Sequence, residues 1–316
     1  MYNEQQKLKF INMNIENQHT AATCRNMFEA TANYEVKFGH DLCEMSTDEM
    51  SVVMSDIAGL RCRSALPRIH LMRRYVSWCS GLCEATNVPQ TTCANNEKIR
   101  TMMIASPEHL QHSMDYLFDQ ESELTIDNTF RAYLWMAYGG LPEELLVQVT
   151  VKHVDLFHKV VNINGHIATL YPEAMQSILN CIALTSFVYK HPNYSHEIVR
   201  ARMPGGVIVR GIKAAPSTKQ IRSELSRRYM KRADKSEGVV ALSYRRVWMS
   251  GLFYRKFIEE QAGVRPDFTD TALEFMSGKE YKLESGRNSV DAKCRQLARD
   301  YMKDYIRWKE TFYEQL

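Results

Sequence analysis

The sequence lacks any apolar run of about 18 residues, the length that a membrane-spanning helix needs. Its first ten residues, MYNEQQKLKF, have neither the apolar core nor the cleavage site of a secretory signal peptide. Membrane proteins and exported proteins are therefore not expected. We predict a cytoplasmic protein without a membrane partner.

Glycine and proline are also scarce, with 14 and 9 residues in a chain of 316 and no glycine-rich run. Sandwiches and barrels of many short strands need more turn residues than this. The composition, 45% hydrophobic and 24% charged, is that of an ordinary globular chain. These values predict a mainly α-helical protein, and the length favours two domains.

The eight cysteines include no pair with the tight spacing of a zinc knuckle. The closest two, Cys79 and Cys83, have CxxxC spacing, which places both thiols on one helical face. Disulfide frameworks are typical of small secreted domains, not of a large chain without an export signal. Gly205 and Gly206 are too few for a phosphate-binding loop. We therefore interpret the cysteines as free thiols and predict no metal site and no cofactor.

The net charge is only +3, but the two signs are unevenly distributed. Residues 200–265 contain sixteen Lys and Arg against five Asp and Glu, so this window carries +11 and the rest of the chain −8. Such a cluster is typical of a protein that binds phosphates, because a polyanion relieves the repulsion among like charges. The alternative is a basic face that acidic neighbours balance within the fold.

The first hundred residues are predicted to form helices separated by short polar turns. A capping box of Ser46 and Glu49 begins one of them. After a basic turn, RCRSALPR, comes a helix whose buried face is marked by apolar residues at helical spacing: Ile69, Met72, Val76 and Cys79. Arg73 and Arg74 lie on its outer edge. The polar stretch Asn87–Lys98 is the best candidate for a linker, so we predict domains at residues 1–95 and 96–316.

Turn residues divide the second domain into further elements. The pair Gly139-Gly140 ends one helix, and Pro142 begins the next. An Asn-Gly turn at residues 164 and 165, flanked by β-branched residues, predicts a small β-hairpin. Ser217 and Gln220 then form the capping box of a basic helix, KQIRSELSRRYMKR. Its inward residues are Ile221, Leu225 and Tyr229.

A second basic helix, LSYRRVWMSGLFYRKFIEE, is apolar nearly all round, which is typical of a helix at the centre of a domain. Arg245 and Arg246 lie in its first turn, where their charge opposes the helix dipole. A phosphate that is bound there by guanidinium and backbone N–H groups would relieve this conflict. A buried arginine ion pair is the alternative.

The order of these parts resembles that of tyrosine recombinases, the phage integrase family. YEVKFGHDLCEMSTDEM and YVSWC resemble its core-binding domain, YGGLPEELLVQVTVKHVDL resembles its motif TGLRxxELxxLxWxDID, INGHIATLYP its β-hairpin and LSYRRVW its HxLR motif. The resemblance covers almost the whole chain. It implies a two-domain recombinase-like architecture, mainly α with a small β-hairpin or sheet. Residues 1–95 would be the helical, SAM-like core-binding domain, and residues 96–316 a degenerate catalytic-like domain.

The resemblance also implies where a catalytic site would lie. The family cleaves DNA with a tyrosine nucleophile, two arginines, a hairpin lysine and a His or Trp. The first arginine would fall at Leu141 or Pro142, the lysine at or beside His166, and the His of HxLR at Ser243. EFMSGKEYKLESGR contains no LGH motif. Arg246 remains as the only matching arginine.

Tyr301 and Tyr305 are the weak candidates for the nucleophile, and their spacing suits core packing better. We therefore predict that the protein is not an enzyme. A divergent active recombinase is the alternative, and it would need an arginine from elsewhere, such as Arg131 or another chain.

A recombinase fold without these groups would still hold DNA, because many phosphate contacts supply the affinity. The pattern is most similar to the integrase-like lysogeny repressors of SPβ-type Bacillus prophages. It implies a sequence-specific double-stranded DNA-binding protein that occupies operator sites and represses transcription in a bacterial host. A phage regulatory protein and a second copy of the chain, as a homodimer, are the protein partners compatible with this role. An accessory partner of a phage integrase without a DNA role is a third hypothesis, against which the +11 window argues.

The predicted DNA contacts are the basic residues of both domains. They are Arg61, Arg63, Arg68, Arg73, Arg74, Arg210, Lys213, Lys219, Arg222, Arg227, Arg228, Lys231, Arg232, Arg245, Arg246, Arg255 and Lys256.

Overall fold

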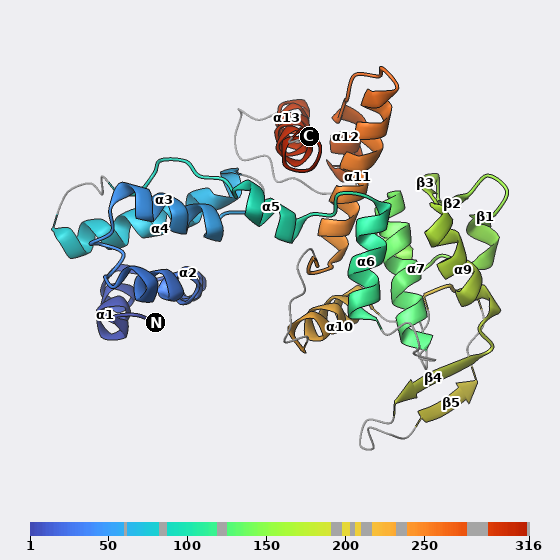
Figure 1. Ribbon diagram of the computed structural model, residues 1–316, viewed down its shortest axis with the longest axis horizontal. Helices are drawn as coiled ribbons and strands as arrows, with labels where there is room; N and C mark the ends of the chain where they lie inside the picture. Colours follow the sequence, from blue (N-terminus) through green and yellow to red (C-terminus); the bar gives the residue numbers. More distant parts are fainter. Residues whose placement is uncertain are drawn as a thin grey trace. The chain divides into compact units, whose positions relative to one another are not determined.

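The computed structural model describes residues 1–59, 62–81, 87–118, 125–190, 198–202, 206–209, 217–231, 239–276 and 290–314. The chain forms two compact units, Met1–Ile99 and Arg100–Leu316. The division falls a few residues after the predicted boundary at 95. The protein is mainly α-helical with a small three-stranded antiparallel sheet, as predicted (Figure 1).

Four helices build the N-terminal unit, and a fifth leads into the second unit. They are α1 (Glu4–Asn14), α2 (Gln18–Phe38), α3 (Thr47–Ile57), α4 (Cys62–Ser80) and α5 (Asn96–Met102). The side chain of Asn17 caps α2 by accepting from the backbone N–H groups of His19 and Thr20. The predicted capping box is confirmed at α3, where Ser46 and Glu49 bond to each other's backbone N–H.

The predicted buried face of α4 is confirmed, because Ile69, Met72 and Val76 are buried in the core of this unit. The prediction of a basic turn over RCRSALPR was wrong, since α4 already begins at Cys62 and includes Pro67. A proline in the second turn removes one backbone hydrogen bond, and the helix continues because Ala65 and Ile69 pack into the core on either side of it.

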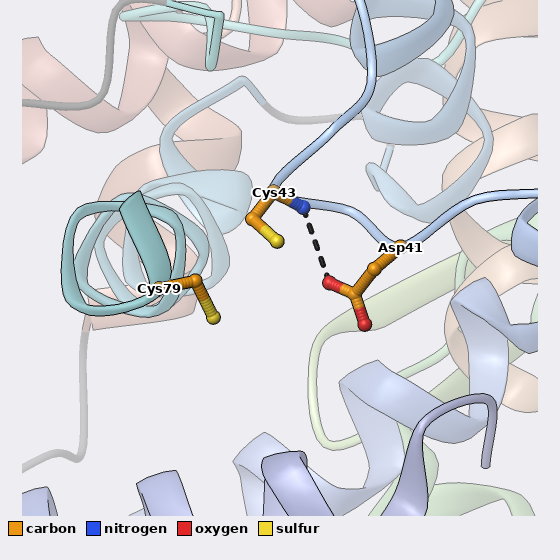
Figure 2. A group of neighbouring side chains, drawn as sticks. All are labelled: Asp41, Cys43 and Cys79. Carbon is orange, nitrogen blue, oxygen red and sulfur yellow. Dashed lines mark hydrogen bonds between the residues drawn. The ribbon is translucent and has the colours of Figure 1, made fainter. Parts of the chain in front are cut away.

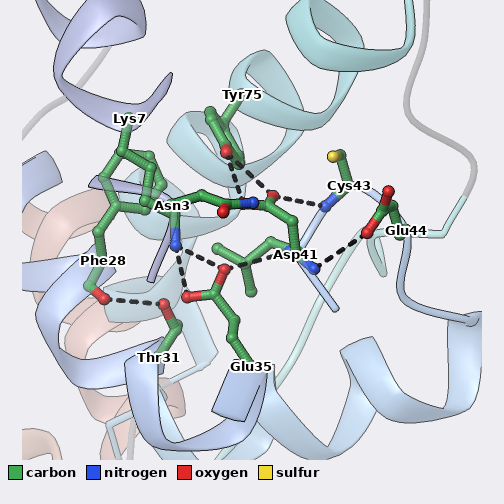
Figure 3. A network of polar contacts seen from close by, with 10 residues as sticks. Asn3, Lys7, Phe28, Thr31, Glu35, Asp41, Cys43, Glu44 and Tyr75 are labelled. Carbon is green, nitrogen blue, oxygen red and sulfur yellow. Dashed lines mark hydrogen bonds and ion pairs between the residues drawn. The ribbon is translucent and has the colours of Figure 1, made fainter. Parts of the chain in front are cut away.

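A buried ion pair joins α1 to α2. The Lys7 ammonium lies 2.5 Å from both carboxylate oxygens of Glu35, and neither side chain has any exposed surface (Figure 3). The backbone N–H of Leu42 also donates to Glu35 at 3.3 Å. Burial of a charge is costly unless its partner is close, so each residue makes the other tolerable in the core.

Within the described residues, the C-terminal unit contains most of the helices and all five strands. Its helices are α6 (Pro107–Leu117), α7 (Thr125–Gly139), α8 (Glu143–Leu146), the 3-10 helix η1 (Val151–His153), α9 (Pro172–Ala183), α10 (Thr218–Lys231), α11 (Tyr244–Gln261), α12 (Thr269–Met276) and α13 (Val290–Phe312). Its strands are β1 (Val154–Asp155), β2 (Val160–Ile163), β3 (His166–Thr169), β4 (Ser186–Lys190) and β5 (Ile198–Arg202).

Helix α7 is the centre of this unit, and α9 and α11 both pack against it. The closest approach is at Gly251 of α11, where an added Cβ would lie 1.9 Å from the carbonyl oxygen of Tyr138. Only glycine fits at such a helix crossing. The prediction that α11 lies centrally in its domain is confirmed by this contact and by its buried Val247 and Phe253.

The predicted hairpin is confirmed as β2 and β3, which pair antiparallel with Ile163 opposite His166. Asn164 and Gly165 form its turn with positive φ angles of 52° and 82°. Strand β1 adds to the other edge of β2. The antiparallel pair of β4 and β5 is a second sheet, which the sequence patterns did not predict.

The remaining local predictions concern α10 and the cysteines. Ser217 and Gln220 form the predicted capping box, and Ile221 and Leu225 are buried. Among the described cysteines, five have free thiols, but Cys93 is disulfide-bonded, so the interpretation of all eight as free thiols was wrong. Sequence spacing does not tell which thiols meet in space. Within the described residues, no helix is both long and apolar enough to span a membrane.

Candidate functional site

A cavity of about 640 Å³ lies where α7 ends, between the β2–β3 hairpin, α11 and α12. Its lining residues are Pro142, Glu143, Glu144, Leu145, Asn164, His166, Tyr244, Trp248, Thr271, Glu274 and Phe275. A second cavity of about 550 Å³ shares His166, Trp248, Thr271 and Glu274 with it. The predicted positions of the first arginine and of the hairpin lysine therefore lie together at this place in the fold.

Aromatic side chains of α11 hold the chain at the position predicted for the first arginine. The Tyr244 hydroxyl donates to the carbonyl of Leu141 at 3.3 Å, and the Trp248 indole N–H donates to the carbonyl of Gly140 at 3.1 Å. Leu141 itself is fully buried in the core. A hydrophobic side chain that points into the core thus occupies one of the two candidate arginine positions.

Carboxylates dominate the charge of the first cavity. Glu143 accepts from both the Nε and the NH2 group of Arg222 at 2.8 Å, and from the Tyr133 hydroxyl at 3.2 Å. Glu274 lies 2.6 Å from the Nδ1 atom of His166. Glu144 is a third carboxylate in the wall.

Two cations, Arg255 and Lys256, line the second cavity together with Glu259. The Arg255 guanidinium is buried and donates to the carbonyl of Tyr138, and burial lowers its pKa. The Lys256 ammonium lies 2.8 Å from a carboxylate oxygen of Glu259. The two cations are therefore already engaged by acceptors of the protein itself.

Arg246, the one matching arginine of the family motif, lines neither cavity. Its NH1 group donates to the carbonyl of Ala241 at 3.0 Å, and burial lowers the pKa of its guanidinium. The side chain of Ser243 caps the start of α11 by accepting from the backbone N–H of Arg246. Arg245, in contrast, is exposed. The two arginines therefore point into different surroundings.

Tyr301 and Tyr305 of α13 are both buried in an aromatic cluster. The Tyr305 hydroxyl donates to a carboxylate oxygen of Glu260 at 2.5 Å, and its ring lies 5.9 Å from that of Phe253. Burial and the nearby Glu260 raise the pKa of Tyr305. The Tyr301 ring lies 6.5 Å from that of Trp248, a residue that lines both cavities, while Tyr301 itself lines neither.

Three of the arginines predicted to bind DNA in the N-terminal unit have described side chains, and each of these bonds to a backbone carbonyl of this unit. Arg68 donates to the carbonyl of Ile57, Arg73 to that of Val88 at 3.3 Å and Arg74 to that of Asn14 at 2.6 Å. A neutral carbonyl leaves the arginine its full charge. These contacts fix the position of each guanidinium group and leave its positive charge uncancelled.

On α10, all three arginines form ion pairs. Arg222 pairs with Glu143, and Arg227 with Glu224 at 2.5 Å. Arg228 lies 2.5 Å from Asp127 and 2.9 Å from Glu224, and its guanidinium covers the rings of Phe118 and Phe130. Only 18% of its side chain is exposed. Arg228 is thus a packing residue, whereas Lys219 is exposed at the start of the same helix.

The remaining predicted contacts lie outside the described part of the chain. Arg61, Arg210, Lys213 and Arg232 belong to undescribed residues, as do the side chains of Arg63 and Lys231.

Sequence reasoning had missed Tyr244, Trp248 and Glu274 as cavity residues. The first two share one face of α11 at i and i+4 spacing, which is a usable signal. Glu274 pairs with His166 across 108 positions, which no local pattern reveals.

Comparisons with known proteins give two kinds of likeness. Residues 1–81 match the family model described as MrpR, N-terminal core-binding domain. None of the curated proteins compared with the chain matches it. Among solved structures, the chain is similar to XerA recombinase, with 11% identity, a TM-score of 0.36 and 98% of each chain covered.

The chain is also similar to the Tn1549 transposon integrase solved in complex with circular intermediate DNA. The identity is 8% and the TM-score 0.32, with 93% of this chain and 98% of the integrase chain covered. A variant of the same integrase gives 10% identity and a TM-score of 0.33. These are distant likenesses along almost the full length.

Proposed function

We propose that this protein is a sequence-specific double-stranded DNA-binding protein that represses transcription and does not cleave DNA. The proposal assigns it to the cytoplasm of a bacterial host, where it keeps a prophage dormant by occupying operator sites. Three features support this role: the family model matched by residues 1–81, the recombinase-like order of motifs and the +11 charge of residues 200–265. Phosphate contacts supply affinity whether or not chemistry follows.

The observation that carries the proposal is the lining of the first cavity. A scissile phosphate placed there would meet the carboxylates of Glu143, Glu144 and Glu274. Strand cleavage needs preorganised cations where charge develops on the phosphate. Of the two candidate positions for the first arginine, Leu141 is buried in the core and Pro142 lines the cavity without a charge.

The alternative of an active recombinase required Arg131 or another chain to supply the missing arginine. Arg131 is engaged elsewhere, because its NH1 group lies 2.6 Å from Asp115 and its NH2 group donates to the carbonyl of Phe118 at 3.1 Å. Its side chain is only 12% exposed. This contact favours a protein that binds DNA without breaking it.

A nicked suicide substrate should trap no covalent protein–DNA adduct. The reason is that Tyr301 and Tyr305 are buried and that three carboxylates line the first cavity, whereas the reaction needs an accessible nucleophile and cations at the phosphate. Denaturing gels of protein mixed with labelled substrate check this, with a competent tyrosine recombinase as the positive control. An adduct that disappears in Tyr301→Phe or Tyr305→Phe would restore the recombinase interpretation.

Exposed and buried cations should respond differently to removal. Lys219→Ala and Arg245→Ala should each weaken binding to all DNA sequences equally and lower the salt dependence by about one charge, with an unchanged melting temperature. Arg228→Ala should instead destabilise the fold by about 3 kcal/mol, because it leaves Asp127 buried without its cation. Gel shifts and thermal unfolding of the three variants separate these effects. Equal losses of stability in all three would contradict the assignment.

A further inference from the structure

Two cysteines and an aspartate that are distant in sequence meet inside the N-terminal unit. Asp41 and Cys43 belong to the turn between α2 and α3, and Cys79 is in the last turn of α4. The two sulfur atoms and a carboxylate oxygen all lie within 4.8 Å of one another. Figure 2 shows the three side chains directed toward one common space.

We propose that Asp41, Cys43 and Cys79 bind one zinc ion, which fastens the α2–α3 turn to the end of α4. Two sulfurs with one carboxylate form a donor set that suits Zn²⁺, whereas Mg²⁺ and Ca²⁺ prefer oxygen ligands alone. Three protein ligands leave the fourth tetrahedral position to solvent. Both cysteines are partly exposed, so solvent and metal can reach them.

The carboxylate of Asp41 is already held in place by neutral donors. The Tyr75 hydroxyl lies 2.9 and 3.0 Å from its two oxygens, the backbone N–H of Cys43 donates at 3.2 Å and the Asn3 amide at 3.1 Å (Figure 3). Outer donors of this kind orient a metal ligand before the metal arrives. Because the Tyr75 hydroxyl has a single hydrogen, these groups are three donors. They leave one of the roughly four lone-pair positions of the carboxylate for a metal.

The charge around Asp41 points to a cation. Asp41 is 2% exposed, and in the described part of the chain it forms no ion pair. The nearby Lys7 is already paired with Glu35 at 2.5 Å. A buried carboxylate without a cation is costly, and a metal ion between it and the two sulfurs supplies one.

The sulfur of Cys79 is also positioned, because the Gln6 amide donates to it at 3.1 Å. When the metal binds, each cysteine loses its S–H proton to solvent, and the divalent cation then lies in direct contact with the two thiolates and the Asp41 carboxylate. Cys79 lies nearest to Cys83 in sequence, and the fold brings it to Cys43.

Cobalt titration of the full chain tests the site, because tetrahedral Co²⁺ substitutes for Zn²⁺ and is coloured. The protein is first reduced with a phosphine and freed of metal with a chelator. We expect one equivalent of Co²⁺ to give tetrahedral d–d bands and a thiolate-to-cobalt charge-transfer band, both abolished by added zinc. The absence of these bands in the wild-type chain overturns the proposal, whatever the variants show.

Variants then assign the ligands. Cys43→Ser and Cys79→Ser should each lose about half of the charge-transfer intensity and bind cobalt at least about tenfold more weakly. Tyr75→Phe keeps both sulfurs and should weaken binding about 10- to 100-fold with an unchanged spectrum. Cys294→Ser, which removes a buried thiol of the other unit, is the matched control and should behave as wild type. Equal binding by Cys43→Ser, Cys79→Ser and the control would overturn the assignment.

Discussion

Raising the salt concentration from about 50 to about 200 mM should weaken binding to double-stranded DNA by about a thousandfold or more. Each phosphate contact releases condensed counterions, so the logarithm of affinity falls linearly with the logarithm of salt concentration. Four of the predicted cations are ion-paired within the protein, so we do not count them as phosphate contacts that release counterions. They are Arg222, Arg227, Arg228 and Lys256. The others are numerous enough for the roughly 6 to 10 contacts on which this estimate rests.

A gel-shift or fluorescence-anisotropy series on one duplex measures this slope, and the same series on random DNA separates the specific part. Single-stranded DNA of the same length is the control, since its lower charge density gives a shallower slope. A flat response to salt would show that the +11 window is balanced within the fold, which the ion pairs of α10 already show for part of it.

Gly251→Ala should be the most damaging single substitution in the C-terminal unit. The new methyl group would lie 1.9 Å from the carbonyl oxygen of Tyr138, which is backbone and cannot rotate away. Helices α7 and α11 would have to separate, and the core between them would lose contact. We expect a loss of about 3 kcal/mol or more, and a melting temperature lower by about 10 °C for this unit.

Gly165→Ala is the matched control, because its Cβ would meet nothing within 4 Å. Its positive φ of 82° costs alanine only about 1 kcal/mol. Thermal unfolding followed by circular dichroism compares the two. If both variants melt at the same temperature, the close approach of the two helices is not what glycine provides at position 251.

Local signals in the sequence predicted the elements that local forces determine. The capping boxes at Ser46 and Ser217 and the Asn164-Gly165 turn are each complete within a few residues, and the structure has all three. The start of α4 was missed because Pro67 is a local breaker that the core outweighs. Long-range packing, which no window of sequence contains, decided that helix boundary.

At the candidate site, the arrangement of the helices and the hairpin was predictable from the sequence, and the side-chain directions were not. The fold brings the hairpin, the end of α7 and the start of α11 together, as the resemblance implied. The direction of each side chain was not predictable, because Arg246 and Trp248 are two positions apart on one helix and face different surroundings. The charge count treated every arginine alike, whereas Arg228 is paired with Asp127 and lies over two phenylalanine rings.

The buried ion pair of Lys7 and Glu35 determines how α1 is aligned along α2. A slip of α1 along α2 by one turn would move it by about 5.4 Å. That slip would separate the ammonium from the carboxylate and leave both charges buried alone, at a cost of about 3 to 5 kcal/mol. One alignment of α1 on α2 is therefore far below its neighbours in energy. The same alignment positions Asn3, which directly precedes α1. The Asn3 amide donates to Asp41, so the turn that carries Asp41 depends on the alignment of α1 as well.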